Sequence, residues 1–361
     1  MLKSSAVDLE ALAERASRRG GVRLYGRSVA RVLSALLATD DFWQVVDRAA
    51  LPVPGAAAIV EELLDLGWVE RRGDGLALTE AGREAVERFE VRPPVRHACP
   101  ACEGRGVPFW ADRALYQTFL ALAKDRPESV QEFDQGYVTP ETTVARVLHM
   151  ASRGDLDGKE ILVLAAEDDL TGLAIALTRR AKRVLILDID PRLIEFDRRA
   201  FQELGIENAE ARVFDLRNPF PEEWLGAFDV FVTDPPETPR AFRAFIARGI
   251  AALRAPGSAG YFGLTLRDAS LFRWAEFQRA LLDYGVVLTE ILQDFNVYEI
   301  WPYHGETRAA RIAPTKRPPR APWYRSSWQR VEALPGFRGE NLAFTEEDLR
   351  EIYLDEESST T

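Results

Sequence analysis

Residues 229–238 read Asp-Val-Phe-Val-Thr-Asp-Pro-Pro-Glu-Thr, an apolar run that ends in an acidic turn. The run predicts a buried strand of a parallel sheet at 230–233. Its two prolines stop the strand and extend the chain, so we expect the carboxylates of Asp234 and Glu237 at the strand's carboxyl end. In an open α/β sheet, ligands bind at that edge. The stretch therefore predicts both the fold class and the place of a site.

Further strand candidates on both sides of this run alternate with helices. The strands are expected at 160–165, 183–188, 210–214, 259–263 and 286–294, and the helices at 171–180, 192–204, 239–252 and 271–284. This rhythm predicts an α/β domain with a Rossmann-like, doubly wound, mostly parallel sheet of the methyltransferase type.

The N-terminal part of the chain has a different pattern. Apolar residues recur at helical spacing in 29–37, 42–49 and 57–66, and a hairpin is expected around Gly73-Asp74-Gly75 before a last helix. Helices followed by a β-wing predict a winged-helix domain. Its expected recognition helix carries three acids and no Lys or Arg, which opposes phosphate contact. We expect this domain to dock or to form a homodimer, and we expect no binding of nucleic acid.

These patterns set the expected domain boundaries. We expect a winged-helix-like domain at 1–92, a Rossmann-like domain with a Cys-x-x-Cys lead-in at 93–330, and an acidic tail at 331–361. Apolar residues interleave with the acids of the tail, so the tail is expected to fold over the site and present carboxylates to a polycation. A solvated tail is the alternative.

The charge of the 361-residue chain restricts its partners. A formal net charge of −11 argues against a large phosphate-binding surface and suits cationic ligands. No segment reaches the roughly 18 apolar residues of a membrane span, and the N-terminal residues lack the apolar core of a signal peptide. We expect a cytoplasmic protein with no membrane partner.

Both cysteines of the chain lie in one short stretch, Cys99-Pro100-Ala101-Cys102. A Cys-x-x-Cys pair is half of a zinc site, and the chain has no second pair to complete it. His97 could add a third ligand, and a metal shared between two chains remains the alternative. We favour a tight turn with two reduced thiols and expect no metal.

The turn after the first strand of the expected sheet is acidic where many nucleotide-binding turns are rich in glycine. It reads Ala165-Ala166-Glu167-Asp168-Asp169-Leu170-Thr171-Gly172. The three carboxylates would repel the carboxylate of S-adenosylmethionine, and they would attract a ligand whose tail is an amine. Decarboxylated S-adenosylmethionine is such a ligand. The alternative is an acidic helix N-terminus that exploits the helix dipole.

Acids also end the next two strands. Asp190 lies where an acid commonly holds ribose hydroxyls, and it is preferred over Asp188 because a proline follows it. Asp215, after the third strand, is placed to accept a hydrogen bond from an adenine amino group. With Asp169 and Asp234, these acids predict a site for a nucleoside sulfonium.

Two other segments combine polar and aromatic residues. Gln135 and Tyr137 precede an expected helix cap at Thr139 and are placed to line the mouth of the site. Asp294 and Tyr298 end a late strand, and carboxylates beside aromatic faces suit alkylammonium ligands.

Five stretches together resemble the branched-chain polyamine synthase family, the N(4)-bis(aminopropyl)spermidine synthases. They are 99–106, 133–143, 167–172, 234–238 and 294–298. One departure is Ala166-Glu167-Asp168-Asp169, where the family has Gly-Asp-Asp-Asp. The resemblance implies transfer of aminopropyl groups from decarboxylated S-adenosylmethionine, a co-substrate, to the secondary amine of spermidine, without metal or other cofactor. The products would be N(4)-aminopropylspermidine, N(4)-bis(aminopropyl)spermidine and methylthioadenosine.

The resemblance also distributes roles among these residues. It implies that Asp169 is the catalytic proton acceptor. It also implies that Asp234 and Glu237 bind the polyamine. The residue patterns add Gln135, Asp294 and Tyr298 to the expected polyamine site, and they place donor binding at Glu167, Asp168, Asp190, Asp215 and Tyr137.

Two other functions compete with this one. Amino-methyltransferases that act on nucleic acid with S-adenosylmethionine carry an aromatic residue after Asp-Pro-Pro, and Glu237 takes that place here. The second competitor is a non-enzymatic winged-helix sensor of polyamines or nucleosides, which the acidic recognition helix disfavours.

Overall fold

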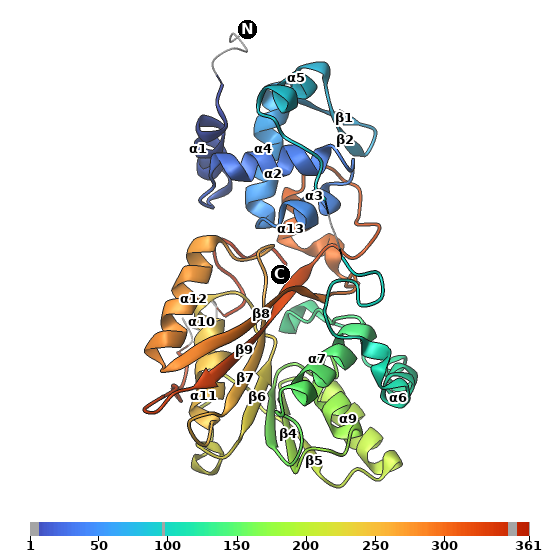
Figure 1. Ribbon diagram of the computed structural model, residues 1–361, viewed down its shortest axis with the longest axis vertical. Helices are drawn as coiled ribbons and strands as arrows, with labels where there is room; N and C mark the ends of the chain where they lie inside the picture. Colours follow the sequence, from blue (N-terminus) through green and yellow to red (C-terminus); the bar gives the residue numbers. More distant parts are fainter. Residues whose placement is uncertain (1–6, 96–97, 346–351, 361) are drawn as a thin grey trace.

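The computed structural model describes residues 7–95, 98–345 and 352–360. Two parts lie one above the other along the longest axis of the molecule (Figure 1). The N-terminal module is mostly helical, and the larger part below it is an α/β body built around one sheet.

The N-terminal module consists of helices and one hairpin in the expected order. Its elements are α1 (Leu9–Gly20), α2 (Gly26–Leu36), α3 (Phe42–Ala49), α4 (Val53–Asp65), β1 (Val69–Arg72), β2 (Gly75–Leu78) and α5 (Glu80–Arg88). Thr79 caps α5 by accepting a hydrogen bond from Gly82 N at 3.1 Å. A Cβ on Gly82 would lie 2.0 Å from the carbonyl oxygen of Trp68, so only glycine lets α5 approach the hairpin this closely.

The module shares a hydrophobic core with a late segment of the chain. The indole Nε1 of Trp43 donates to the carbonyl of Arg317 at 2.9 Å, and the rings of Trp43 and Trp323 lie 4.8 Å apart. Helix α13 (Arg308–Ile312) packs near α4 in the same cluster. The N-terminal module and the α/β body are therefore joined by packing as well as by the chain.

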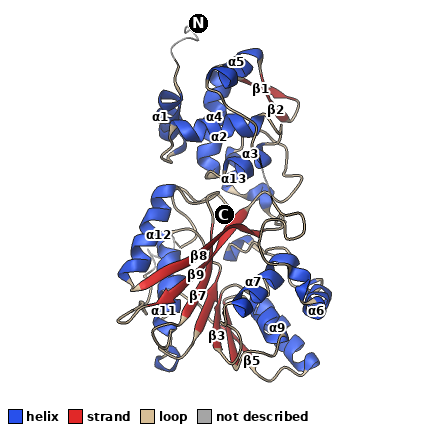
Figure 2. Cartoon of the chain, in the orientation of Figure 1, coloured by secondary structure: helices blue, strands red, loops and turns tan. Residues whose placement is uncertain are grey.

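The sheet has seven strands in the order β5-β4-β3-β6-β7-β9-β8 (Figure 2). Their bounds are β3 (Glu160–Leu164), β4 (Arg183–Asp188), β5 (Ala209–Val213), β6 (Val230–Thr233), β7 (Ala259–Leu264), β8 (Val286–Val297) and β9 (Arg325–Ala333). Strands β3 to β7 pair in parallel, and β9 is antiparallel to both of its neighbours. This confirms the predicted Rossmann-like, mostly parallel sheet of the methyltransferase type.

Helices cover both faces of the sheet. The main ones are α6 (Arg113–Ala123), α7 (Pro140–Ser152), α8 (Thr171–Leu177), α9 (Pro191–Leu204), α10 (Pro239–Phe242), α11 (Arg248–Ala252) and α12 (Leu271–Asp283), with a π-helical turn at Arg243–Ala247. Alternate strand residues face opposite layers. Thus Val163 packs in the core with α7 to α9, whereas Leu164 packs in the core with α10 to α12.

Strand β9 was not predicted from the sequence. It carries Ser326, Ser327, Gln329 and Arg330 as buried residues, so it has neither an apolar run nor an alternating pattern. Arg330 is neutralised by Asp155 at 2.8 Å. Because β9 ends at Ala333, the expected boundary between residues 330 and 331 cuts a strand and is wrong in that detail.

The register of the sheet determines which turns meet. Leu164 pairs with Leu187 on one side and with Thr233 on the other. The turns after β3, β4 and β6 therefore leave the sheet side by side at its carboxyl edge. Among the described residues, no helix is long and apolar enough to cross a membrane.

Candidate active site

A cavity lies at the carboxyl edge of the sheet, where the acidic turns meet. Its described lining includes seven carboxylates, from Asp134, Asp168, Asp169, Asp188, Asp215, Asp234 and Glu237. Aromatic rings form much of the remaining wall, from Phe133, Phe214, Phe245, Tyr298, Trp301, Tyr303, Tyr324 and Tyr353. Arg217 is the one basic residue in this described lining. Such a cavity suits an elongated polycation.

The turn after β3 carries two of these carboxylates. Asp169 Oδ1 accepts a hydrogen bond from Val138 N at 2.6 Å, and Asp168 Oδ2 accepts one from Gly136 N at 3.0 Å. These bonds hold the segment before α7 against the turn. Burial raises the pKa of Asp168 to about 7, with further contributions from the charges of Asp188 and Asp234.

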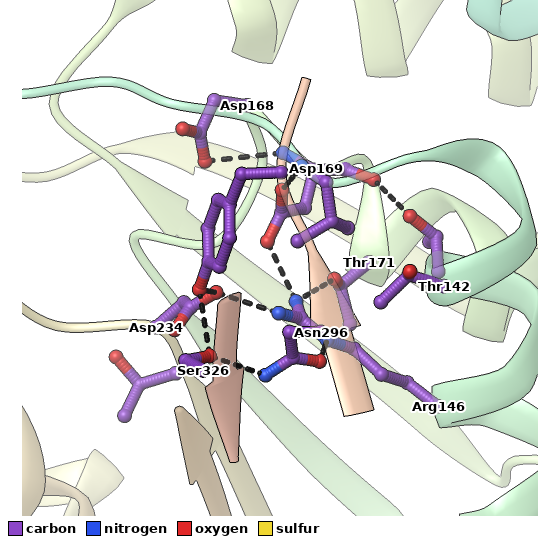
Figure 3. A network of polar contacts seen from close by, with 12 residues as sticks. Thr142, Arg146, Asp168, Asp169, Thr171, Asp234, Asn296 and Ser326 are labelled. Atoms are coloured by element: carbon purple, nitrogen blue, oxygen red, sulfur yellow. Dashed lines mark hydrogen bonds and ion pairs between the residues drawn. The ribbon is translucent and has the colours of Figure 1, made fainter. Parts of the chain in front are cut away.

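Arg146, inside α7, connects the ends of two neighbouring strands (Figure 3). Its Nη1 donates to Asp169 Oδ2 and its Nη2 to Asp234 Oδ2, both at 2.6 Å. Its Nε donates to Asn296 Oδ1 at 2.9 Å, and the guanidinium lies 4.8 Å from the ring centroid of Trp328. The side chain is completely buried. Burial raises the pKa of Asp169, and Arg146 opposes that rise.

The Asp-Pro-Pro-Glu turn after β6 supplies two acids to the cavity. Tyr298 donates its hydroxyl hydrogen to Asp234 Oδ2 at 2.7 Å. Glu237 accepts from Thr265 N at 3.2 Å and from the Tyr324 hydroxyl at 3.3 Å. Burial raises the pKa of Glu237, and the nearby charges of Asp268 and Asp234 add to the rise. The structure thus brings Asp234, Glu237 and Tyr298 together, as the sequence predicted.

At the end of β4 the structure corrects the choice between two acids. Asp188 lines the cavity, whereas Asp190 lies behind it, completely buried and capping α9 through Arg192 N at 2.9 Å. Gln135 lines the cavity but donates its Nε2 hydrogen to Asp190 Oδ2 at 3.0 Å. The proline after Asp190 indicates a helix cap and not a ligand contact. The residue that faces the cavity is Asp188, the last residue of β4.

Glu167 is a second correction. Its carboxylate accepts from Gly172 N and Leu173 N, both at 3.0 Å, and so caps helix α8. It is completely buried and is absent from the described lining of the cavity. The alternative of an acidic helix N-terminus therefore applies to Glu167, while Asp168 and Asp169 face the cavity.

Three further predicted residues are placed as follows. Asp215 lines the cavity, but Arg217 pairs with it at 2.6 Å. Tyr137 lies outside the described lining, and its ring stacks with the Arg126 guanidinium at 3.3 Å. Asp294 is also outside it, because its backbone adopts a φ of 55° and its carboxylate pairs with Arg267 at 2.7 Å. The acid-and-aromatic cluster at 294–298 therefore contributes only Tyr298 to the cavity.

Several lining residues were missed by sequence reasoning. Trp301, Tyr303 and Tyr324 come from the connection between β8 and β9, which has no regular pattern. Arg146, which is completely buried behind the described lining and pairs with two of its acids, was missed as well. Only Asp188 gave a usable signal, because it is the last acid before the end of a predicted strand.

The tail folds back onto the cavity, as expected. Ile352, Tyr353 and Thr360 belong to the lining. Ser359 N donates to Asp268 Oδ1 at 2.9 Å, and Asp355 pairs with Arg273 at 2.6 Å. Asp355 thus anchors the tail and lies outside the described lining of the cavity. The acids at 346–348 lie outside the described residues.

The Cys-x-x-Cys stretch forms a turn with two free thiols. Cys102 Sγ accepts a hydrogen bond from Gly106 N at 3.3 Å. The turn directs Arg105 into the body, where Arg105 Nε donates to the carbonyl of Phe295 at 3.1 Å. His97 lies outside the described residues, and within the described ones no group of three or more His, Cys, Asp or Glu side chains is arranged to hold a metal ion.

A methyltransferase-type Rossmann sheet with a carboxylate-lined cavity at its carboxyl edge fits one class of enzyme: transferases that take an alkyl group from a nucleoside sulfonium and give it to a cationic amine. Comparison with known proteins identifies the member of this class. The sequence model of the branched-chain polyamine synthase A C-terminal domain matches residues 114–360. The chain belongs to the branched-chain polyamine synthase family.

Two named relatives are similar in sequence to this chain over nearly its whole length. The N(4)-bis(aminopropyl)spermidine synthase of Thermococcus kodakarensis is 46% identical over 349 residues, covering 96% of this chain and 99% of the relative. The enzyme of the same name from Methanocaldococcus jannaschii is 43% identical over 356 residues, covering 98% and 100%.

A solved structure has the same fold. The crystal structure of the branched-chain polyamine synthase from Thermus thermophilus, in complex with N4-aminopropylspermidine and 5'-methylthioadenosine, has a TM-score of 0.90 with 45% identity. The superposition covers 98% of this chain and 98% of the Thermus thermophilus chain. The protein is thus an aminopropyltransferase of polyamine biosynthesis, and decarboxylated S-adenosylmethionine is its co-substrate.

Proposed function

We propose that the cavity at the carboxyl edge of the sheet is where an aminopropyl group passes from decarboxylated S-adenosylmethionine to the secondary amine of spermidine. The observation that carries this proposal is the meeting of seven carboxylates and eight aromatic rings around one cavity. Spermidine and the donor are both cations, and carboxylates with aromatic faces are the groups that bind such ligands.

The donor side of the cavity is formed by the ends of β3, β4 and β5. We assign the nucleoside to the wall of Asp188, Phe214 and Asp215, because strand ends on this side of the sheet hold ribose and base in Rossmann-like folds. The amine of the donor's aminopropyl arm is assigned to Asp168. A carboxylate there would repel S-adenosylmethionine, whose carboxylate the donor lacks.

The acceptor side is formed by the turn after β6 and the connection between β8 and β9. We assign the polyamine to Asp234, Glu237 and Tyr298, with the rings of Trp301 and Tyr324 beside them. The ring centroids of Trp301 and Tyr324 lie 5.5 Å apart at an interplanar angle of 83°. The two ring faces thus point in nearly perpendicular directions, and each can contact an ammonium group. Ammonium groups along a flexible chain can be held by such alternating acids and rings.

The reaction is a displacement at the carbon bonded to the sulfonium. The nitrogen lone pair forms the new carbon–nitrogen bond while the carbon–sulfur bond breaks and its electron pair leaves with methylthioadenosine. The acceptor amine is protonated at neutral pH, so it must first lose a proton. We assign Asp169 as the acceptor of that proton, because it lies between the two sides of the cavity and its burial makes it a stronger base than a solvated aspartate.

The second transfer starts from a tertiary amine. This nitrogen loses no further proton during the displacement, and the product carries a permanent positive charge. The carboxylates of Asp169 and Asp234 would then act by stabilising that charge. The same cavity can thus support both N(4)-aminopropylspermidine and N(4)-bis(aminopropyl)spermidine as products.

The proposal is tested by incubating the protein with spermidine and decarboxylated S-adenosylmethionine and identifying the polyamines by mass. Each transfer adds one aminopropyl group and releases one methylthioadenosine. Replacing the donor by S-adenosylmethionine is the control for donor selection. Methylation of spermidine, or methylation of a nucleic acid, in place of aminopropyl transfer would contradict the proposal.

For the N-terminal module we propose a winged-helix-like domain that serves docking or homodimer formation. Four helices, a hairpin and a further helix follow one another, and from α2 onward their order is that of a winged helix. The helix before the hairpin, α4, carries Glu61, Glu62 and Asp65, and Arg71 pairs with Glu61 at 2.7 Å. Sedimentation of the full chain measures the oligomeric state, and a gel-shift with duplex DNA measures nucleic-acid binding, which we expect to be absent.

A further inference from the structure

Arg146 is a buried cation whose two partners, Asp169 and Asp234, line a cavity suited to cations. It comes from α7, on one side of the sheet, and its guanidinium reaches the turns after β3 and β6 (Figure 3). Neither the composition of the turns nor the chemistry of the transfer requires a buried arginine at this place. Its presence therefore needs an explanation of its own.

We propose that Arg146 is a positioning residue for aminopropyl transfer, which fixes the carboxylates of Asp169 and Asp234 relative to each other across neighbouring strands. This inference rests on the proposed function. Asp169 is the proton acceptor of that proposal, and Asp234 belongs to its polyamine side, so Arg146 joins the two sides of the reaction.

The geometry of the guanidinium favours this role. Nη1 and Nη2 belong to one rigid plane, and each donates to a different carboxylate at 2.6 Å. Asn296 holds Nε at 2.9 Å, and the ring of Trp328 covers the guanidinium. The guanidinium plane is thus held at Nη1, Nη2 and Nε and covered on one face. A displacement reaction requires the nitrogen lone pair in line with the carbon–sulfur bond, so a small shift of either carboxylate costs rate.

The charge of Arg146 has a second effect. Two carboxylates on adjacent strand ends repel each other, and without a cation one of them would take up a proton. A protonated Asp169 could not accept the proton of the substrate amine. Arg146 keeps its charge because Asp169 and Asp234 together outweigh the effect of burial, which alone would lower its pKa.

The competing explanation is a purely structural ion pair that attaches α7 to the sheet. Such a pair would affect stability when broken, because it would leave an unpaired buried charge. It would not shift the pH dependence of catalysis. The two explanations therefore differ in a measurable way.

The test measures kcat, the KM of spermidine and the pH profile of kcat for the full-length chain, with decarboxylated S-adenosylmethionine as donor. For Arg146→Met we expect kcat to fall on the order of 100-fold, as for a misplaced reacting group. The acidic limb of the profile should move to higher pH, because the carboxylates lose their counter-charge. The KM of spermidine should not rise, because the site loses a positive charge.

Arg146→Lys separates geometry from charge. An ammonium keeps the positive charge but cannot hold two carboxylates in one plane. We expect the acidic limb to stay in place while kcat falls at least about tenfold. Should Arg146→Met fail to fold, this variant decides alone, and an unchanged kcat would overturn the inference.

Arg330→Met is the matched control. Arg330 is also buried and paired, to Asp155 at 2.8 Å, and neither residue belongs to the described lining of the cavity. We expect it to lower the melting temperature with the acidic limb in place. A folded Arg146→Met with wild-type kcat and pH profile would leave Arg146 a structural residue. Absence of aminopropyl transfer by the wild-type chain would instead contradict the proposed function.

Discussion

A methyl group on Gly263 would lie 2.0 Å from Oδ1 of Asp234. Gly263 lies near the end of β7, next to β6, and its missing side chain leaves the space that the carboxylate occupies. The neighbouring strand is thus adapted to the acid at the end of β6. A requirement for glycine here comes from the site and not from the backbone conformation.

Gly263→Ala should displace the Asp234 carboxylate without breaking the strand. We expect kcat/KM for spermidine to fall at least about tenfold, because both the proposed polyamine contact of Asp234 and its bond to Arg146 are disturbed. Gly305→Ala, where an added Cβ meets no atom within 4 Å, is the control. Steady-state kinetics with both substrates decides, and equal values for the two variants would contradict the expectation.

Asp169→Asn should lower kcat by a factor on the order of 10² to 10⁴, because it removes the proposed proton acceptor while keeping the shape of the side chain. The amide can still accept from Val138 N, so circular dichroism and melting temperature should show a folded protein. Near-normal turnover would transfer the role of proton acceptor to Asp234 or Glu237.

Donor binding should depend on the ionisation of Asp168. Its pKa is raised by burial to about 7, so its protonated form dominates below that pH and its carboxylate above it. The kcat/KM of decarboxylated S-adenosylmethionine should therefore decrease as the pH falls through about 7. The donor's own charges do not change in this range. In Asp168→Asn the kcat/KM should be low and its decrease through about 7 should be smaller, with any remaining limb coming from Asp169. An unchanged limb would exclude Asp168 as a source.

Releasing the tail should weaken the binding of both substrates. Tyr353 and Thr360 line the cavity, and the ion pair of Asp355 with Arg273 holds the segment between them. We expect Asp355→Asn to raise the KM of spermidine and of the donor, and high salt to bring the wild type closer to the variant. Glu356→Gln, at an exposed position, is the control. Unchanged KM values would leave the tail without a role in binding.

The acids behind the β3 turn should make stability depend on pH. Burial raises the pKa of Glu167 to about 8, and it raises that of Asp197, which lies against Glu167, as well. Groups with a raised pKa hold more protons in the folded than in the unfolded chain. Their contribution to stability is present in acid and is lost as the pH rises through about 8. Asp197→Asn should make the melting temperature fall less steeply as the pH rises. An unchanged dependence of the melting temperature on pH would contradict this prediction.

Much of the fold could be predicted because its signals are local. The strand at 230–233 and the strand at 183–188 were expected with the bounds that the structure gives them. Both are short apolar runs that end at an acid. Strand β9 could not be found in this way, because its polar residues are buried by partners such as Asp155 that are distant in sequence.

The candidate site could be predicted only where strand order fixes proximity. Asp168, Asp169, Asp234 and Glu237 lie around one cavity because they follow neighbouring parallel strands. Which way a side chain turns there depends on helix caps and ion pairs. Glu167 caps α8, and Asp294 pairs with Arg267, so both acids leave the cavity for reasons that a single sequence does not contain.

The order of strands at one edge of the sheet has a consequence for how the molecule folds. Strand β9 follows β8 in the sequence, yet it lies between β7 and β8. Strand β8 pairs with β9 and with no other described strand of the sheet, so we expect the two to be added as one antiparallel pair. Tyr298, Trp301 and Tyr324 belong to this pair or to its connection. We therefore expect these three rings to be placed late, after long-range contacts that form slowly, and a folding intermediate without the pair would have the acidic turns after β3, β4 and β6 but not these rings.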